Sequence, residues 1–221
     1  MHFKPKALLF DLNGTMIDDM EYHNKAWHQI LNNDLNADIS YEEVKKQMYG
    51  KNDELLKRVF GDNFFTQNQL DEISIKKEKI YQQDYAQDLS LIKGLDQFLF
   101  NAEKSGILMA IGSAAIPFNI DFVLDGLNIR SYFKAIVSAN DVETSKPNPE
   151  TFLKGAKALG VQPEDCLVLE DAPKGVEAAL SANMKCIVLS TAHGVEEFAN
   201  YSNILKIVSD YCDPIFKELT D

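Results

Sequence analysis

The sequence has little arginine and an excess of acidic residues. Arginine occurs twice, at Arg58 and Arg130, and the formal net charge is −12. A nucleic-acid backbone would be repelled by such a chain on average, so we expect no nucleic-acid partner. A small phosphorylated metabolite stays compatible with this charge, provided that a metal ion and a few lysines lie beside its phosphate.

Cysteine and long apolar runs are also scarce. The three cysteines, Cys166, Cys186 and Cys212, form no CxxC pair, which argues against a disulfide framework and favours a reducing compartment. No stretch approaches the roughly 18 apolar residues of a membrane span. The opening segment MHFKPKALLFDL lacks the features of a signal peptide. We therefore expect a cytoplasmic monomer with no membrane partner.

Short apolar runs alternate with amphipathic stretches along most of the chain. Each run has three to six residues rich in Val, Ile, Leu or Phe, as in buried parallel strands. Strands alternating with helices predict an α/β fold with a Rossmann-like parallel sheet. The expected strands are 7–10, 108–111, 135–137, 166–169, 186–189 and 204–208.

Residues 18–90 follow a different pattern, because no buried-strand run occurs there. Ser40 with Glu43, and Thr66 with Gln69, have the spacing of capping boxes. Helices are expected near 20–33, 40–48, 52–60 and 66–86. The chain is therefore predicted to form an α/β core domain from 1–17 and 91–221, with a small helical cap domain, 18–90, inserted after the first strand.

Polar residues follow several of the predicted strands directly. Asp11, Ser113 and Asp171 come just after strands, as does the segment that precedes Lys146. Ligands of open α/β sheets bind outside the carboxyl ends of the strands, so these residues are expected to converge on one edge. The inserted block leaves the core close to Asp11 and would cover that edge.

Four motifs carry chemistry at that edge. In Asp11–Thr15, a carboxylate can attack phosphorus to form an aspartyl phosphate, Gly14 allows a tight turn, and Thr15 offers a hydroxyl and an amide to an anion. Each motif taken alone is also typical of a purely structural feature: a turn, a helix cap, a solvated loop or an acidic helix start. The other three are Ser113 with Ala114 before a helix, Lys146 between Ser145 and Pro147, and the acidic pair Glu170 and Asp171, which suits Mg²⁺.

As an ordered set, these motifs resemble those of the haloacid dehalogenase-like hydrolases. The Gly-Val-Glu-Ala-Ala run at 175–179 and the helical insert are similar to the β-phosphoglucomutase-like subgroup. The resemblance covers almost the whole chain. It implies a magnesium-dependent phosphotransfer enzyme.

The resemblance also implies a role for each matching residue. Asp11 would be the nucleophile, and Ser113 and Lys146 would hold the phosphoryl group. Mg²⁺ would be bound by Asp11, the carbonyl of Asn13, Asp171, and Glu170 directly or through water. Gly14, Thr15, Ala114 and the cap residues His23, Lys51 and Lys77 would contact the substrate.

Position 13 departs from the family pattern, which has a second aspartate there as general acid and base. Asn13 cannot exchange a proton near neutral pH, so hydrolysis of the aspartyl phosphate should be slow unless another group activates water. Asp18, Asp19 and His23 are the candidates for that group. The sequence leaves open whether Asn13 is native, engineered, or prone to deamidate before Gly14.

Three functions remain open at this point. Hydrolysis of a small phosphate monoester, such as a sugar phosphate, is favoured. A β-phosphoglucomutase reaction is the second, although the cap position that carries a phosphate-gripping arginine in that subgroup is Asp53 here. The third is a catalytically weak protein that binds a phosphometabolite, which Asn13 motivates.

Overall fold

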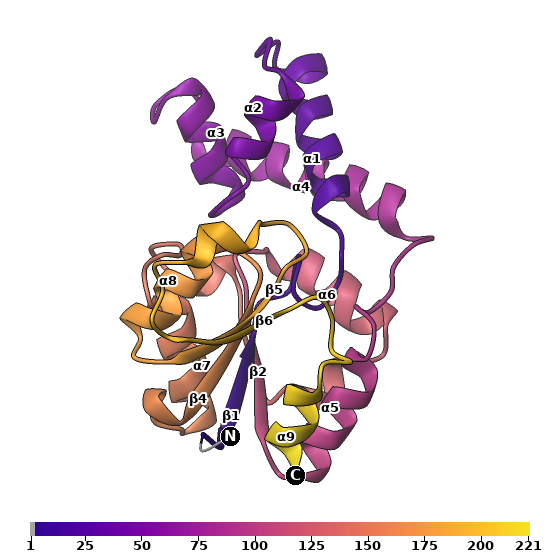
Figure 1. Ribbon diagram of the computed structural model, residues 1–221. Coiled ribbons are helices and arrows are strands. Elements are labelled where there is room, and N and C mark those ends of the chain that lie inside the picture. The colour runs from indigo at the N-terminus through magenta and orange to yellow at the C-terminus, as the bar shows by residue number, and fades with distance from the viewer. Residues whose placement is uncertain (1–2) are drawn as a thin grey trace. The chain divides into compact units, whose positions relative to one another are not determined.

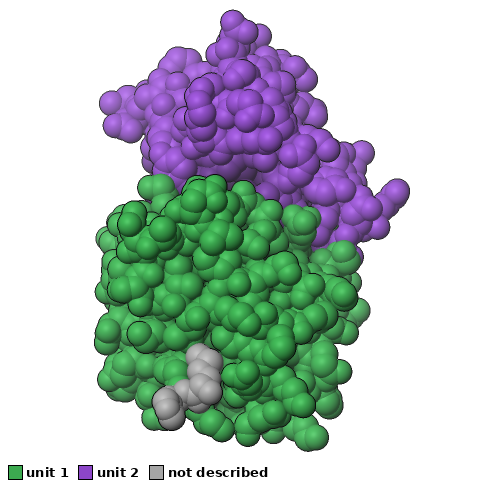
Figure 2. All heavy atoms as spheres, in the orientation of Figure 1, with its two compact units in different colours: residues 1–18, 90–221 green, residues 19–89 purple. Residues whose placement is uncertain are grey.

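The computed structural model describes residues 3–221 and divides the chain into two compact units (Figures 1 and 2). Unit 1 comprises the described residues up to Asp18 together with Ser90–Asp221, and unit 2 comprises Asp19–Leu89. The predicted core domain begins at residue 1, and its first two residues lie outside the described part of the chain.

Unit 1 contains a six-stranded parallel sheet in the order β3-β2-β1-β4-β5-β6 within the described residues. This confirms the predicted α/β class. Every expected strand is present, and three of them differ from expectation by one residue at one end. The strands are β1 Ala7–Phe10, β2 Leu108–Gly112, β3 Ala135–Val137, β4 Cys166–Glu170, β5 Lys185–Leu189 and β6 Ile204–Val208.

Helices cover both faces of this sheet (Figure 1). Alternate strand residues, such as Leu9 and Val168, form a core with α7 and α8, while Phe10 on the opposite face packs against Phe98 of α5. Strand alternation sends successive side chains to opposite faces, and because both faces are covered the strands are apolar throughout. The helices are α5 Leu95–Lys104, α6 Pro117–Gly126, α7 Glu150–Leu159, α8 Pro173–Ser181 and α9 Pro214–Thr220.

Unit 2 is helical, with α1 Met20–Gln29, α2 Tyr41–Lys46, α3 Asn52–Phe60 and α4 Gln67–Tyr85. Its core is built around Trp27, the single tryptophan of the chain. Thr66 and Gln69 form the predicted capping box at the start of α4. At α2, the Ser40 hydroxyl accepts from the Glu43 amide at 3.2 Å.

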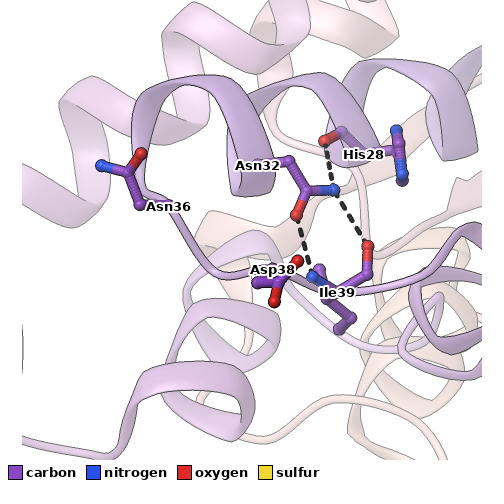
Figure 3. A pocket seen from close by; sticks show the side chains of 5 residues that line it. All are labelled: His28, Asn32, Asn36, Asp38 and Ile39. Carbon is purple, nitrogen blue, oxygen red and sulfur yellow. Dashed lines mark hydrogen bonds between the residues drawn. The ribbon is translucent and has the colours of Figure 1, made fainter.

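The expected helix 20–33 ends differently, because after Gln29 it continues as a π-helical segment, Ile30–Asp34. Figure 3 shows how the following loop is closed. The Asn32 side chain donates to the carbonyls of His28 (3.2 Å) and Ile39 (2.9 Å) and accepts from the Ile39 amide (2.8 Å). The hollow lined by His28, Asn32, Asn36, Asp38 and Ile39 is thus the space inside a loop that Asn32 folds onto its own helix.

Candidate active site

The carboxyl edge of the sheet in unit 1 collects the polar residues of three neighbouring strands. Phe10 pairs with Ile111 of β2 on one side and with Leu169 of β4 on the other. The Asp11 amide then continues the ladder by donating to the Leu169 carbonyl at 3.0 Å. This register places Asp11 beside the end of β4, where Glu170 and Asp171 follow, as strand order and strand ends alone predict.

Lys146 is the cation of this edge. Its Nζ donates to Asp11 Oδ1 at 2.6 Å and to Glu170 Oε1 at 2.8 Å, and it lies 4.6 Å from the centroid of the Phe152 ring. Burial alone would lower the pKa of this ammonium. The charges of Asp11 and Glu170 outweigh burial and hold the pKa above its ordinary value of 10.5, so Lys146 is a fixed positive charge.

Glu170 is engaged on both carboxylate oxygens. Oε1 accepts from Lys146, and Oε2 accepts from the amides of Asp171 and Ala172, both at 2.8 Å. A Cβ on Gly175 would collide with the Glu170 carboxylate, so the start of α8 approaches this side chain because residue 175 has none. Glu170 therefore fixes Lys146 and shapes the turn after β4.

Asp171 is buried beside two other carboxylates, which oppose its ionisation. The Thr15 hydroxyl donates to its Oδ1 at 3.2 Å. Burial, followed by the charges of Glu170 and Asp11, raises the pKa of Asp171 well above its ordinary value. Gly14 has φ +71°, and a Cβ there would collide with the Asp171 carboxylate. The Asn13–Gly14 turn and Asp171 thus come into contact through a glycine.

The residues of this edge fit a magnesium ion. Three carboxylates, of Asp11, Glu170 and Asp171, face a single buried ammonium, so one more cation would balance the charge. Within residues 3–221 no three His, Cys, Asp or Glu side chains form a ready cation cage. A metal here would take two carboxylates, a backbone carbonyl and water, and Mg²⁺ is the ion that keeps several waters.

Ser113 follows β2, the other neighbour of β1 in the sheet. Its amide donates to the Val137 carbonyl at 2.9 Å, so that group belongs to the sheet ladder. The buried hydroxyl accepts from the Ala115 amide at 3.2 Å, which shapes the turn that contains Ala114. The Ser113 hydroxyl proton and the Ala114 amide are the groups predicted to meet a phosphoryl oxygen.

Two residues of the site were missed in the sequence. The Thr191 hydroxyl donates to the Gly14 carbonyl at 2.6 Å, and the Tyr211 hydroxyl donates to the Thr15 carbonyl at 2.9 Å. Thr191 comes two residues after β5, so the strand-end rule that selected Ser113 could have found it. Tyr211 follows the last strand in a turn, and no signal in the sequence marks it.

The three predicted cap residues lie in unit 2, where two of them join a buried polar cluster. Lys77 Nζ lies 2.7 Å from His23 Nδ1 and donates to Glu78 Oε1 at 3.0 Å. His23 Nε2 lies 3.2 Å from Asp19 Oδ2, and its ring stacks on Tyr81 at 3.8 Å. Because an ammonium cannot accept a hydrogen bond, His23 accepts from Lys77 at Nδ1 and carries its own proton at Nε2.

Burial and neighbouring charges act in opposite directions on the pKa values of Lys77 and Glu78 in this cluster. Burial lowers the pKa of the Lys77 ammonium, and the attraction of Glu78 offsets only part of that effect. Burial would raise the pKa of Glu78, but Lys77, His23 and the Asn52 side chain outweigh it and leave the pKa lowered. Lys77 is therefore a lysine whose proton is held less firmly than usual.

Lys51 lies at the start of α3, where its amide donates to Glu54 Oε2 at 2.9 Å. Asp53 is paired with Lys57 at 2.7 Å along the same helix. The acidic side chain that replaces the expected arginine is thus neutralised by a neighbour one turn away.

Comparison with known proteins gives a consistent family. Residues 8–189 match the model of the haloacid dehalogenase-like hydrolases. The chain is 30% identical to the fructose-1-phosphate phosphatase YqaB of Escherichia coli, over 85% of this chain and 97% of that protein. It is 32% identical to the beta-phosphoglucomutase of Bacillus subtilis, over 81% and 80%. The crystal structure of beta-phosphoglucomutase from Clostridium difficile superposes with a TM-score of 0.81 at 25% identity, over 98% and 97%.

No helix among the described residues combines the length and the apolar character needed to cross a bilayer.

Proposed function

Because this chain is an enzyme of the haloacid dehalogenase-like hydrolase family, whose relatives include phosphatases and a phosphomutase, we propose that it hydrolyses a small phosphate monoester, such as a sugar phosphate, with Asp11 as the nucleophile. The observation that supports this best is the contact of 2.6 Å between Asp11 and Lys146 at the carboxyl edge of the sheet. A buried carboxylate held by a permanent cation is fixed in place for attack, and the same cation attracts the phosphate.

The reaction would proceed in two displacements at phosphorus. An oxygen of Asp11 bonds to phosphorus as the ester bond to the alcohol breaks, and the alcohol leaves with the bonding electron pair and takes up a proton. Water then attacks the aspartyl phosphate, which releases inorganic phosphate and restores the Asp11 carboxylate. Lys146, the Ser113 hydroxyl and the Ala114 amide would bind the phosphoryl oxygens throughout, with Gly14 and Thr15 beside them.

Asp11, Asp171 and the carbonyl of Asn13 would hold Mg²⁺, with Glu170 binding it directly or through water. Bound Mg²⁺ would supply positive charge beside the transferring phosphoryl group. The Thr15 and Gly14 contacts with Asp171 would orient this carboxylate toward the same point.

Proton transfer is the step that this chain performs differently. The amide of Asn13 cannot protonate the leaving alcohol or deprotonate water. We propose Asp18, Asp19 and His23 as the candidates that replace it. Without such a replacement, the chain would bind its ligand and turn it over slowly, which remains the second candidate function because of Asn13.

Unit 2 would act as the cap that selects the leaving group, with Lys51, Lys77 and His23 as its contacts. Asp53 stands where the resemblance places a phosphate-gripping arginine, which argues against a site for the second phosphate of a bisphosphate and therefore favours hydrolysis over the mutase reaction. An acidic helix start favours a leaving group that is neutral or cationic.

The test is phosphate release from a panel of small esters, including fructose 1-phosphate and β-glucose 1-phosphate, with Mg²⁺ and with a chelator. We expect slow, Mg²⁺-dependent release by this chain. Asn13→Asp should accelerate it by about 10²–10⁴-fold, because a general acid and base is restored. Asp11→Ala should abolish release while unit 1 stays folded.

Retained turnover in Asp11→Ala, or equal turnover in chelator, would contradict the mechanism. Release by Asn13→Asp alone would identify the natural chain as a binding protein. Interconversion of glucose phosphates that requires a bisphosphate would establish the mutase reaction instead.

A further inference from the structure

Arg58 is one of two arginines in the chain, and its guanidinium is turned onto the backbone of its own unit. It lies in α3, half-buried, opposite the segment that links α2 to α3. Its Nη2 donates to the carbonyls of Gln47 (2.6 Å) and Tyr49 (2.8 Å), and its Nε donates to Gln47 Oε1 (3.0 Å). The guanidinium also stacks on the Tyr49 ring, 3.7 Å from the centroid.

These contacts use properties that lysine does not share. Gln47 is the C-terminal cap of α2, at the end of the helix where backbone carbonyls have no partner within it, and its carbonyl also accepts from the Tyr49 amide at 2.8 Å. A cation at this point both satisfies the carbonyls and complements the negative end of the helix. Only a planar guanidinium can donate to two carbonyls and a side-chain amide while it stacks on a ring.

We call the segment between α2 and α3 the 47–51 loop. Its C-terminal end, next to α3, is fixed as well. Gly50 has φ +75°, which turns the chain into α3, and the Glu54 carboxylate accepts from the Lys51 amide. The next residue, Asn52, donates to Glu78 Oε1 at 2.7 Å, and Glu78 in turn holds Lys77. The Lys51 amide is therefore tied to α3, and the first residue of α3 is tied in turn to the buried polar cluster on α4.

We propose that Arg58 is a positioning residue for substrate selection: it holds the 47–51 loop in the conformation that presents Lys51 to the leaving group of the substrate. The inference rests on the proposed function of unit 2, and it deepens that function. Three hydrogen bonds from Nε and Nη2 hold the arginine on the loop, and its assigned role is to position Lys51 without touching the substrate itself. The substrate class that this arrangement would select is a monophosphate ester large enough to reach Lys51, without a second phosphate that would require a guanidinium.

The experiment compares Arg58→Lys with Arg130→Lys, the same substitution at the only other arginine. Arg130 pairs with Asp121 and Asp125 on the surface of unit 1, so it serves as the matched control. Two substrates are used: the best sugar phosphate of the panel, and acetyl phosphate, whose small leaving group would not extend to the loop. A readout without catalysis is the rate of tryptic cleavage after Lys51.

Arg58→Lys should raise KM for the sugar phosphate by ~10-fold, the effect of losing one charge-assisted hydrogen bond, with kcat nearly unchanged. Turnover of acetyl phosphate should stay the same, and cleavage after Lys51 should become faster. Tyr49→Leu, which removes only the stacking, should shift KM in the same direction by a smaller factor. Arg130→Lys should change none of these quantities.

An unchanged KM together with unchanged cleavage would overturn the inference. So would an equal loss of activity toward both substrates, since that would mark a general structural role. If the natural chain and Asn13→Asp hydrolyse none of the esters, the proposed function fails by itself, and the cleavage rate still decides whether Arg58 holds the loop.

Discussion

Each of the two units contains one lysine whose side chain is largely enclosed, 9% exposed for Lys146 and 2% for Lys77, and the two lysines are held in opposite ways. Lys146 in unit 1 touches two carboxylates, while Lys77 in unit 2 touches one carboxylate and an imidazole, with the Trp27 and Tyr81 rings 5.4 and 5.7 Å away. The pKa is raised for Lys146 and lowered for Lys77. Burial lowers the pKa of both lysines, and their partners distinguish them: the two carboxylates in contact with Lys146 outweigh burial, whereas the attraction of Glu78 and Asp19 for Lys77 does not.

The largest effect is expected from Lys146→Met, which removes the cation between Asp11 and Glu170. Unit 1 should lose about 3–5 kcal/mol of stability, because two buried carboxylates lose their partner. Phosphate release should fall by about 10²–10³-fold, because a charge on the transferring group is lost. Stability can be followed by thiol labelling of Cys166 and Cys186, which are buried in unit 1.

Lys157→Met is the control for this prediction, since Lys157 is exposed on α7 and should leave both quantities nearly unchanged. A Lys146→Met protein as stable as that control would mean that the carboxylates at the sheet edge are neutral in the natural chain.

Lys77→Met should cost less, about 1–3 kcal/mol, because it leaves only Glu78 without its cation. Trp27 fluorescence measures this change, since the single tryptophan lies in the core of unit 2. The double variant Lys77→Met/Glu78→Leu should recover most of the loss, as an apolar pair replaces an ionic one. A loss as large as that of Lys146→Met would break the contrast between the two lysines.

Raising the pH into the alkaline range should change the stability of the two units in opposite directions. The raised pKa of Lys146 gives unit 1 stability that is complete below the ordinary value of 10.5 and declines as the pH rises above it. The lowered pKa of Lys77 imposes a cost at neutral pH, because the unfolded chain binds that proton more tightly; the cost shrinks as the pH rises toward 10.5. The slope for one such group cannot exceed about 1.4 kcal/mol per pH unit.

Urea unfolding between pH 8 and 11 tests this, with thiol labelling for unit 1 and Trp27 fluorescence for unit 2. Each slope should be referred to that of Lys146→Met or Lys77→Met, which cancels the titration of all other groups. Slopes of the same sign would contradict the two pKa directions.

The smallest effect is expected at the edge of the site. Thr191→Val removes one hydrogen bond, to the Gly14 carbonyl, and should cost unit 1 about 1 kcal/mol. Thr191→Ser keeps the hydroxyl and is the matched control. If Thr191→Val is as stable as the natural chain in thiol labelling, the hydroxyl contributes nothing and the prediction fails.

The sequence predicts the polar edge of unit 1 well, because two simple rules act there. Apolar runs locate buried strands, and parallel strands bring the residues that follow them to one edge, which places Asp11 beside Glu170 and Asp171. These rules do not predict which hydrogen-bond partner each side-chain atom will have. Glu170 was expected at a metal, and whether it binds one stays a prediction, while its contacts with Lys146 and two amides emerge only in three dimensions.

The buried cluster of unit 2 shows why other features escape sequence analysis. Lys77 and Glu78 stand in the run Ile-Lys-Lys-Glu-Lys-Ile at 75–80, which resembles the solvated face of a helix. The Lys77 ammonium lies near the rings of Trp27 and Tyr81, which come from different helices. The bracing role of Arg58 is equally invisible, since its acceptors are backbone carbonyls that every residue possesses.

The chain enters and leaves unit 2 at two points that are held together on the unit 1 side, where the Ile92 amide donates to the Met16 carbonyl at 2.9 Å. Because the two ends of the insert are attached at neighbouring points of unit 1, the insert does not require the rest of unit 1 to be rearranged. Residues 19–89 can therefore be regarded as an exchangeable cassette. A different helical block, or a short linker, would need only to connect two neighbouring backbone segments of unit 1. Under the proposed role of unit 2, changes in this segment would alter leaving-group preference while the sheet and its carboxylates stay as they are.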